Sequence, residues 1–285
     1  MPDIPIPIVT GPGSQPAEAD GAELDILQLP QGMNTYSPPP LPEPEEVADR
    51  RAALALLKQL HELLQAQRLA QPATRLSLDA LPLPDRELFD QVLGEGEVSI
   101  VCREGDREWR IQESVMAGIW RVRQFDGEAR LISDHVETGR IPAWVATRTF
   151  AGMQARLDLK GVTPEPGVLN APPLIAEIAE HLDKAGQNAP HVINLTLLPQ
   201  TEADLGFLAR VLGEGRVTVL SRGYGNCRVS STATPGVWWV QYFNSQDKNI
   251  LNTLEITDVP EVACAAAEDL RDSAQRLGEI LEIYG

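Results

Sequence analysis

The side chains best suited to redox or metal chemistry are few and scattered along this chain. Its three cysteines, Cys102, Cys227 and Cys264, lie far apart and form no CxxC pair. Its histidines form no HxxxH or HxH pair: they are His61, His135, His181 and His191. Zinc sites and disulfide frameworks use closely spaced ligands, so we expect no metal site, no cofactor and a reducing, cytoplasmic setting. No GxSxG motif is present, and we predict no catalytic residue.

Two glycine-rich turns carry acidic side chains. Gly94–Glu95–Gly96 and Gly213–Glu214–Gly215 have the composition of phosphate-binding loops. Each follows a predicted helix and precedes a predicted strand, which is the wrong order for a dinucleotide cradle, and no Lys–Ser/Thr follows. We interpret Gly94 and Gly213 as helix C-caps. Glu95 and Glu214 remain candidate contacts to a protein partner.

A third glycine-rich segment, Gly223–Cys227, is predicted to be a hairpin turn. It could present the Cys227 thiol to a partner, or it could be a plain turn. A reactive thiol needs a neighbour that lowers its pKa, and no histidine lies nearby in the sequence. The plain turn is therefore favoured, with Tyr224, Asn226 and Cys227 as candidate partner contacts.

The elements that position these residues occur twice. The phrase VLGEGEV at Val92–Val98 returns as VLGEGRV at Val211–Val217, and Gly118–Trp120 returns as Gly236–Trp238, about 118 residues later. Solenoid repeats have periods of roughly 20–50 residues. This longer period indicates a duplicated domain.

Each copy is predicted to hold a helix, a strand, a second helix, four hairpin-linked strands and a closing helix. In the first copy these are 53–64, 76–81, 84–93, 97–103, 108–113, 118–125, 130–137 and a helix from Pro142. In the second they are 174–182, 192–197, 202–212, 216–221, 226–231, 236–244, 251–257 and helices from Pro260 to Tyr284. Such an order predicts an α+β fold of two tandem duplicated domains, each a mainly antiparallel sheet flanked by helices.

The matching tryptophans Trp120 and Trp238 are predicted to pack the two cores. Trp239 should face the other way, because neighbouring side chains alternate along a strand. We therefore expect Trp239 at the interface between the copies or on a partner surface. The groove between the copies is where a partner would first be sought.

A proline-rich acidic arm precedes the repeats. Residues 1–46 hold 11 of the 23 prolines, eight carboxylates and no Lys or Arg. Proline fixes φ and lacks an N–H, so the arm is predicted to be extended or disordered. We expect the arm at 1–44, the first repeat domain at 45–160 and the second at 161–285.

The net charge of −17 opposes nucleic acid and anionic lipid. It suits a basic protein partner, or it serves solubility alone. Because of this charge we expect no nucleic-acid binding. No apolar run is long enough for a membrane-spanning helix, so we also expect no membrane insertion.

Several segments spread over nearly the whole chain carry a resemblance to a known family. They are Gly11–Pro16, Leu93–Ser99, Gly118–Val122, Ile193–Thr196, Gly223–Gly225, Pro260–Val262 and Glu268–Leu277. Together they resemble the hydrogenase expression/formation proteins of the HupH/HyaF/HoxQ type. The last segment adds Asp269, Asp272 and Arg276 as candidate partner contacts.

The resemblance implies a cytoplasmic, non-enzymatic assembly chaperone for uptake [NiFe] hydrogenase. It implies as partners the iron–sulfur small-subunit precursor, before export by the twin-arginine route, and a thioredoxin-like hydrogenase chaperone. One alternative is a protein that delivers or repairs an iron–sulfur cluster, although three scattered cysteines are fewer than the usual four ligands. Another is an enzyme with polar residues of perturbed pKa in a cleft between the copies.

Overall fold

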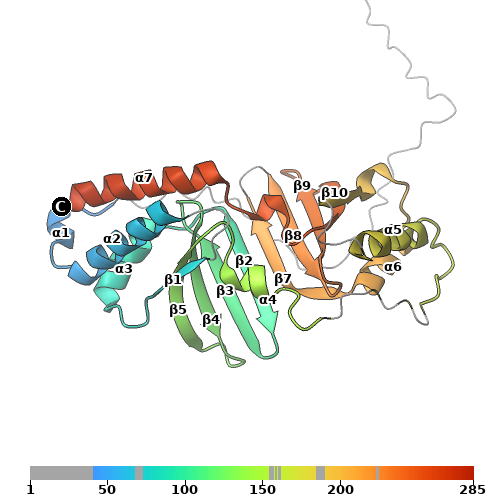
Figure 1. The fold of residues 1–285 in the computed structure, drawn as a ribbon, viewed down its shortest axis with the longest axis horizontal. Helices are drawn as coiled ribbons and strands as arrows, with labels where there is room; N and C mark the ends of the chain where they lie inside the picture. The colour runs from blue at the N-terminus through green and yellow to red at the C-terminus, as the bar shows by residue number, and fades with distance from the viewer. Residues whose placement is uncertain are drawn as a thin grey trace, which may run out of the picture. The chain divides into compact units, whose positions relative to one another are not determined.

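The computed structural model describes residues 41–67, 73–153, 157, 159, 162–183, 190–222 and 225–285, which lie in the compact unit Thr35–Gly285 (Figure 1). Of the predicted arm, residues 1–44, positions 1–40 lie outside the described residues. The helices are α1 Pro44–Val47, α2 Arg51–Ala66, α3 Leu83–Leu93, α4 Ala143–Arg148, α5 Ala171–Asp183, α6 Glu202–Leu212 and α7 Ala267–Tyr284, with short 3₁₀ turns η1 Leu195–Leu197 and η2 Glu261–Ala263. The strands are β1 Thr74–Ser77, β2 Val98–Glu104, β3 Arg107–Glu113, β4 Ile119–Phe125, β5 Leu131–Thr138, β6 His191–Asn194, β7 Glu214–Ser221, β8 Asn226–Thr232, β9 Val237–Phe243 and β10 Asn249–Ile256.

Local sequence signals account for most of these elements. The apolar residues of α2 recur at helical spacing, and Ala53, Leu57, Leu60 and Leu64 are all buried. The strand expected at 192–197 is shorter than predicted. It ends at Asn194, whose side-chain oxygen accepts hydrogen bonds from the N–H groups of Thr196 and Leu197, at 3.0 and 3.3 Å. These bonds turn the chain into η1.

All ten strands form one antiparallel sheet, in the order β1-β5-β4-β3-β2-β7-β8-β9-β10-β6. The two copies meet where β2 pairs with β7, from Val98 opposite Ser221 to Cys102 opposite Val217. The two separate sheets expected from the sequence are therefore joined edge to edge, and a strand pair rather than a groove connects the copies. The joining satisfies two strand edges that would otherwise expose unpaired backbone groups.

Helices cover one face of the sheet at two places. Helices α2, α3 and α7 pack around Ile119 and Val136 of the first copy, while α5 and α6 pack around Val237 and Leu254 of the second. The last helix, α7, follows the second copy in sequence but packs against α2 of the first. Figure 1 shows α7 running alongside α2 and away from α5 and α6. The first copy therefore depends on the chain's C-terminal residues for its core.

The opposite face of the sheet carries a single apolar cluster shared by both copies. Trp120 and Trp238 are fully buried in it, together with side chains of β2, β3, β7 and β8. Helix α4 covers this face through Trp144 and Val145, and η2 covers it through Ala263. The prediction that the matching tryptophans pack the core is confirmed, but they share one core where the sequence suggested two.

Candidate functional site

The two glycine-rich turns are helix caps. Gly94 and Gly213 follow α3 and α6 with positive φ of 55° and 68°, which favours glycine. The next glycine is required by close packing, because a Cβ on Gly96 would lie 2.2 Å from a facing backbone carbonyl oxygen. The cap interpretation is confirmed, and Glu95 and Glu214 are both exposed.

Glu95 and Glu214 lie toward opposite ends of the central strand pair. Glu95 precedes β2, whose first residue Val98 pairs with Ser221 at the end of β7. Glu214 is the first residue of β7 and so lies at the other end. Antiparallel pairing therefore keeps these two predicted contacts apart, and they do not form one site.

The Glu95 turn and the start of α7 meet at a region that we call the acidic corner. It consists of the exposed carboxylates Glu95, Glu97, Glu268, Asp269 and Asp272. Both Glu97 and Asp269 act electrostatically on the buried Glu113, which places them near each other. The fold thus brings the predicted contacts Glu95, Asp269 and Asp272 to one corner, whereas Arg276 lies exposed further along α7.

Helix α7 is anchored firmly at this corner. The Asp269 carboxylate accepts a hydrogen bond from the Ala266 N–H at 3.2 Å and caps the helix. One turn later, the Ser273 hydroxyl donates to the Ala117 carbonyl at 2.9 Å. These contacts hold the acidic side chains of the first turn of α7 in place beside the strands.

Glu113 lies buried beneath the acidic corner at the end of β3. Burial raises the pKa of its carboxyl group, and the charges of Asp269 and Glu97 raise it further, to about 7, against a lowering by the Gly118 N–H that donates to it at 3.1 Å. Glu113 therefore exchanges its proton near neutral pH, although it is packed inside the fold.

The predicted hairpin joins β7 to β8, and Tyr224 lies outside the described residues. Asn226 is half-buried and donates through its amide to the Asp247 carboxylate at 3.3 Å. Cys227 is buried in the core cluster, and burial raises its pKa to about 11. The structure therefore does not present this thiol to a partner.

The other two cysteines are also poor nucleophiles. Burial raises the pKa of Cys102 well above its usual range and that of Cys264 to about 11. Only thiolate attacks or binds metal, so neither side chain is activated.

Trp239 faces away from Trp238, as strand alternation predicts. Its ring packs against the cluster beneath α5 and α6, and its indole N–H donates to the Asn252 side-chain oxygen at 2.5 Å. Strand β8 separates β9 from the β2–β7 junction, so Trp239 does not lie at the interface between the copies.

A matching pair of buried aspartates, which we did not predict from the sequence, holds the helices of both copies. Asp204 of α6 accepts hydrogen bonds from the backbone N–H groups of Leu169, Asn170 and Ala171, at 2.8–2.9 Å, and from Thr201. Burial raises the pKa of Asp204, but these bonds outweigh it and lower the value to about 2.

At the corresponding place in the first copy, Asp85 of α3 accepts from the Ala53 N–H at 2.9 Å. Each aspartate joins the second helix of its copy to the beginning of the first. The signal in the sequence is an aspartate in the first turn of each second helix, at matching positions of the repeat.

A buried ion pair anchors α3 to the sheet. Arg121 of β4 donates to both oxygens of Asp134 on β5, at 2.5 and 2.7 Å, and also to Asp90 of α3. Arg121 and Asp134 are both buried, which costs free energy because two charges leave water. The two hydrogen bonds between them offset that cost. The buried Arg121–Asp134 pair therefore serves to hold the fold together.

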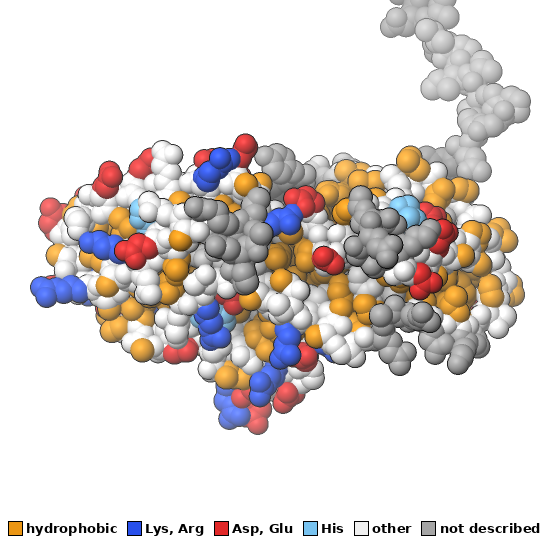
Figure 2. All heavy atoms as spheres, in the orientation of Figure 1, with side chains coloured by type: hydrophobic (Ala, Val, Ile, Leu, Met, Phe, Trp, Pro, Cys, Tyr) orange, Lys and Arg blue, Asp and Glu red, His pale blue; other side chains and the backbone are white. Residues whose placement is uncertain are grey.

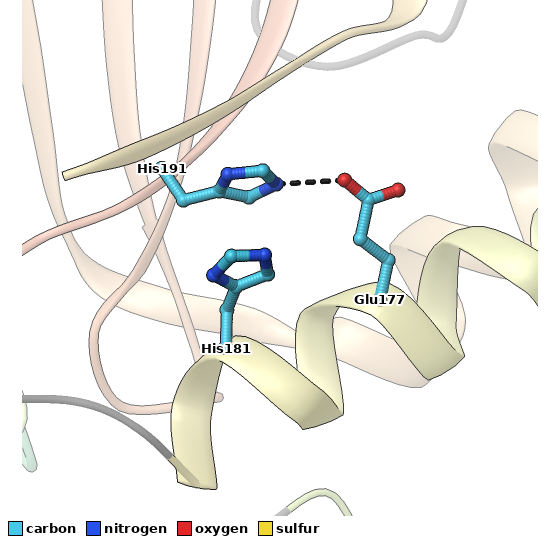
Figure 3. A group of neighbouring side chains, drawn as sticks. All are labelled: Glu177, His181 and His191. Carbon is cyan, nitrogen blue, oxygen red and sulfur yellow. Dashed lines mark hydrogen bonds and ion pairs between the residues drawn. The ribbon is translucent and has the colours of Figure 1, made fainter. Parts of the chain in front are cut away.

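Glu177, His181 and His191 form one further group that the histidine spacing did not reveal (Figure 3). Glu177 and His181 lie one turn apart on α5, and His191 begins β6. One ligand atom from each lies within 4.8 Å of the others, and the His191 Nε2 is 2.7 Å from a Glu177 carboxylate oxygen. The two imidazole rings stack with centroids 3.5 Å apart. The signal was a Glu-x-x-x-His spacing followed by a histidine on the next strand.

Exposed apolar side chains gather around β6, the edge strand of the second copy. Val192, Leu197, Leu198 and Ile250 are among the exposed large hydrophobic residues of the described chain, and Leu197 keeps 80% of its surface. Figure 2 shows hydrophobic side chains over the end that holds α5 and α6. Exposed apolar side chains along a strand edge are the kind of surface that a protein partner covers.

Among the helices that the structure describes, none is long and apolar enough to cross a bilayer.

Comparison with known proteins gives consistent matches along the chain. The family model described as "HupH hydrogenase expression protein, C-terminal conserved region" matches twice, at residues 51–159 and 168–284. The hydrogenase expression/formation protein HupQ of Azotobacter chroococcum is 50% identical over 275 residues, covering 95% of each chain. HoxQ of Cupriavidus necator is 49% identical over 288 residues, covering 100% of this chain and 99% of that one.

A solved structure of the hydrogenase expression protein HupH from Thiobacillus denitrificans is 36% identical, covering 40% of this chain and 94% of that one, with a TM-score of 0.35. The two family-model matches coincide with the two successions of helices and strands that share the sheet. From the full-length identities and this double match, the chain belongs to the HupH family of hydrogenase expression proteins.

Proposed function

We propose that this protein is a non-enzymatic accessory protein of hydrogenase maturation that acts in the cytoplasm. In this proposal it is an assembly chaperone that holds the iron–sulfur small-subunit precursor of an uptake [NiFe] hydrogenase before export, beside a thioredoxin-like chaperone. The observation that carries the proposal is the match, over nearly its whole length, to proteins named for hydrogenase expression and formation. The more specific role, binding of the small-subunit precursor, rests on the family resemblance and on the acidic corner.

The acidic corner supports binding of a basic segment. Its five carboxylates are exposed on a chain of net charge −17. The export signal of the precursor would bring paired arginines to it. Opposite charges attract over about a Debye length, roughly 8 Å at physiological salt, so such a patch speeds encounter and fixes orientation.

A holding role also fits the unusual ionisable groups. The depressed pKa of Asp204 comes from helix capping, and the raised pKa of Glu113 comes mainly from burial. Both are consequences of the fold and neither side chain faces an open site. The iron–sulfur delivery alternative gains no support, because Cys102 and Cys227 are buried in the core with raised pKa values.

The test is co-purification with the small-subunit precursor, with and without its signal peptide. We expect binding of the full precursor to weaken as salt rises, and to weaken further when the exposed Glu268 and Asp272 are both changed to Lys, which leaves the Asp269 cap in place. Changing Glu279 and Glu282 to Lys, toward the other end of α7, alters the net charge by the same amount, so this matched control should bind like the native protein.

Failure of both precursor forms to bind would refute the proposed partner. Binding that is insensitive to salt and to the two substitutions would retain the partner but refute the role of the acidic corner.

A further inference from the structure

We propose that Glu177, His181 and His191 form a binding site for a divalent transition-metal ion of the Zn²⁺ type. The inference is independent of the role in hydrogenase maturation proposed above. The group combines two imidazoles and one carboxylate, with one ligand atom of each within 4.8 Å of the others. Figure 3 shows the three side chains converging from α5 and from the start of β6.

Helix and sheet geometry explain why the three residues meet. Residues four apart lie on one face of a helix, so Glu177 and His181 point the same way from α5. His191 pairs with Ile256 of β10, and alternation gives it the same face as the buried Ile193 and the opposite face to the exposed Val192. Helix α5 packs over β10 on that same face. The ligand set is therefore fixed by regular elements and does not depend on a loop conformation.

The fold itself does not require this trio. The corresponding positions of the first copy, by repeat spacing and by strand register, hold Gln59, Leu63 and Thr74. Those residues occupy the same helix face and strand position without offering a metal ligand set. The pair His191–Glu177 is also partly solvent-exposed, at 28% and 41%, where an ion pair adds at most about 1 kcal/mol of stability.

The ligand types select the class of metal. Two imidazole nitrogens with one carboxylate oxygen suit Zn²⁺ and neighbouring first-row ions, whereas Mg²⁺ and Ca²⁺ prefer oxygen ligands throughout. A three-residue set leaves at least one coordination position for water or for a group from a partner. All three side chains are half-buried, so such a ligand can approach from solvent.

Binding requires a small rearrangement of the rings. The imidazoles stack with an interplanar angle of 8°, and a nitrogen lone pair lies in the plane of its ring. Two parallel rings cannot both point at one ion, so at least one ring must rotate about its side-chain bonds. Partial exposure of the group permits that rotation without disturbing the core.

The experiment is calorimetric titration of untagged, metal-free, full-length protein with Zn²⁺ under reducing conditions. We expect one ion per chain at micromolar affinity or tighter, and at least a tenfold loss of affinity for each of His181→Ala, His191→Ala and Glu177→Gln. His61→Ala removes a histidine from α2 and is the matched control, with native affinity expected. Circular dichroism of each metal-free variant checks that it folds.

X-ray absorption at the zinc edge distinguishes this site from the cysteines. We expect nitrogen and oxygen neighbours at about 2.0–2.1 Å with imidazole scattering, and no sulfur shell at about 2.3 Å. Absence of stoichiometric binding by the native protein would overturn the proposal. Native affinity in a folded variant that combines His181→Ala, His191→Ala and Glu177→Gln, or a sulfur shell, would overturn it equally.

Discussion

Replacement of Glu113 by Gln should make the protein more stable at neutral pH and leave its stability almost unchanged near pH 4.5. In the folded protein the pKa of this carboxyl group is about 7, against an ordinary value of 4.5. Burial is the main cause of the rise. The Gln side chain keeps an oxygen that can accept the hydrogen bond from the Gly118 N–H.

The sign and size of the effect follow from proton linkage. Between pH 4.5 and 7 the folded state holds a proton that the unfolded state has released, so the free energy of unfolding falls as pH rises. Below pH 4.5 both states are protonated and the group contributes nothing. Above pH 7 the native protein bears the full cost of a buried charge, roughly 3 kcal/mol at 1.36 kcal/mol for each pKa unit.

The assay is urea unfolding of native and Glu113→Gln protein at half-unit steps from pH 4.5 to 8. Other groups titrate in both proteins, so the difference between the two curves isolates Glu113. It should grow from near zero to about 3 kcal/mol in favour of the variant. Glu95→Gln removes an exposed charge from the same corner and controls for net charge. Two parallel stability curves across this range would refute the reasoning.

Three further predictions concern the buried groups. Asp204→Ala should cost more than about 3 kcal/mol in urea unfolding, because it leaves several backbone donors unpaired, and should exceed the cost of Asp85→Ala; equal costs would contradict this account. Arg121→Ala should cost about 3–5 kcal/mol, since the buried Asp134 loses both hydrogen bonds that it accepts from Arg121, whereas the more exposed Arg123→Ala should cost under about 1 kcal/mol. Cys227 should resist alkylation at pH 8 until urea unfolds the protein, and rapid labelling of native protein, located by mass spectrometry, would argue against its burial.

Local chemistry made much of the fold readable from the sequence. Helical spacing in α2, positive-φ glycines after α3 and α6, and matching tryptophans on β4 and β9 are each set by residues close together in the chain. The repeat then indicated the order of the elements, because both copies independently predict the same succession of helices and strands. Family membership followed from stretches spread along the whole sequence.

The joining of the sheets could not be read in the same way. Whether β2 and β7 pair with each other or remain edge strands depends on backbone hydrogen bonds between residues more than a hundred positions apart. Either arrangement suits the same alternation of apolar and polar side chains. The packing of α7 on α2 could not be predicted either, because it also joins segments far apart in the sequence. An amphipathic helix specifies a buried face but not the surface that buries it.

The candidate sites likewise show which features short segments of sequence indicate and which depend on tertiary packing. The sequence marked Glu95 by its glycine-rich turn, and Asp269 and Asp272 by one of the segments that carry the family resemblance. Only the tertiary structure gathered them at one corner around Glu113, buried Cys227 in the core, and set Glu177 and His181 of α5 against His191 of β6. Residue types are fixed by the chain, whereas their meeting across helix and strand is decided by packing.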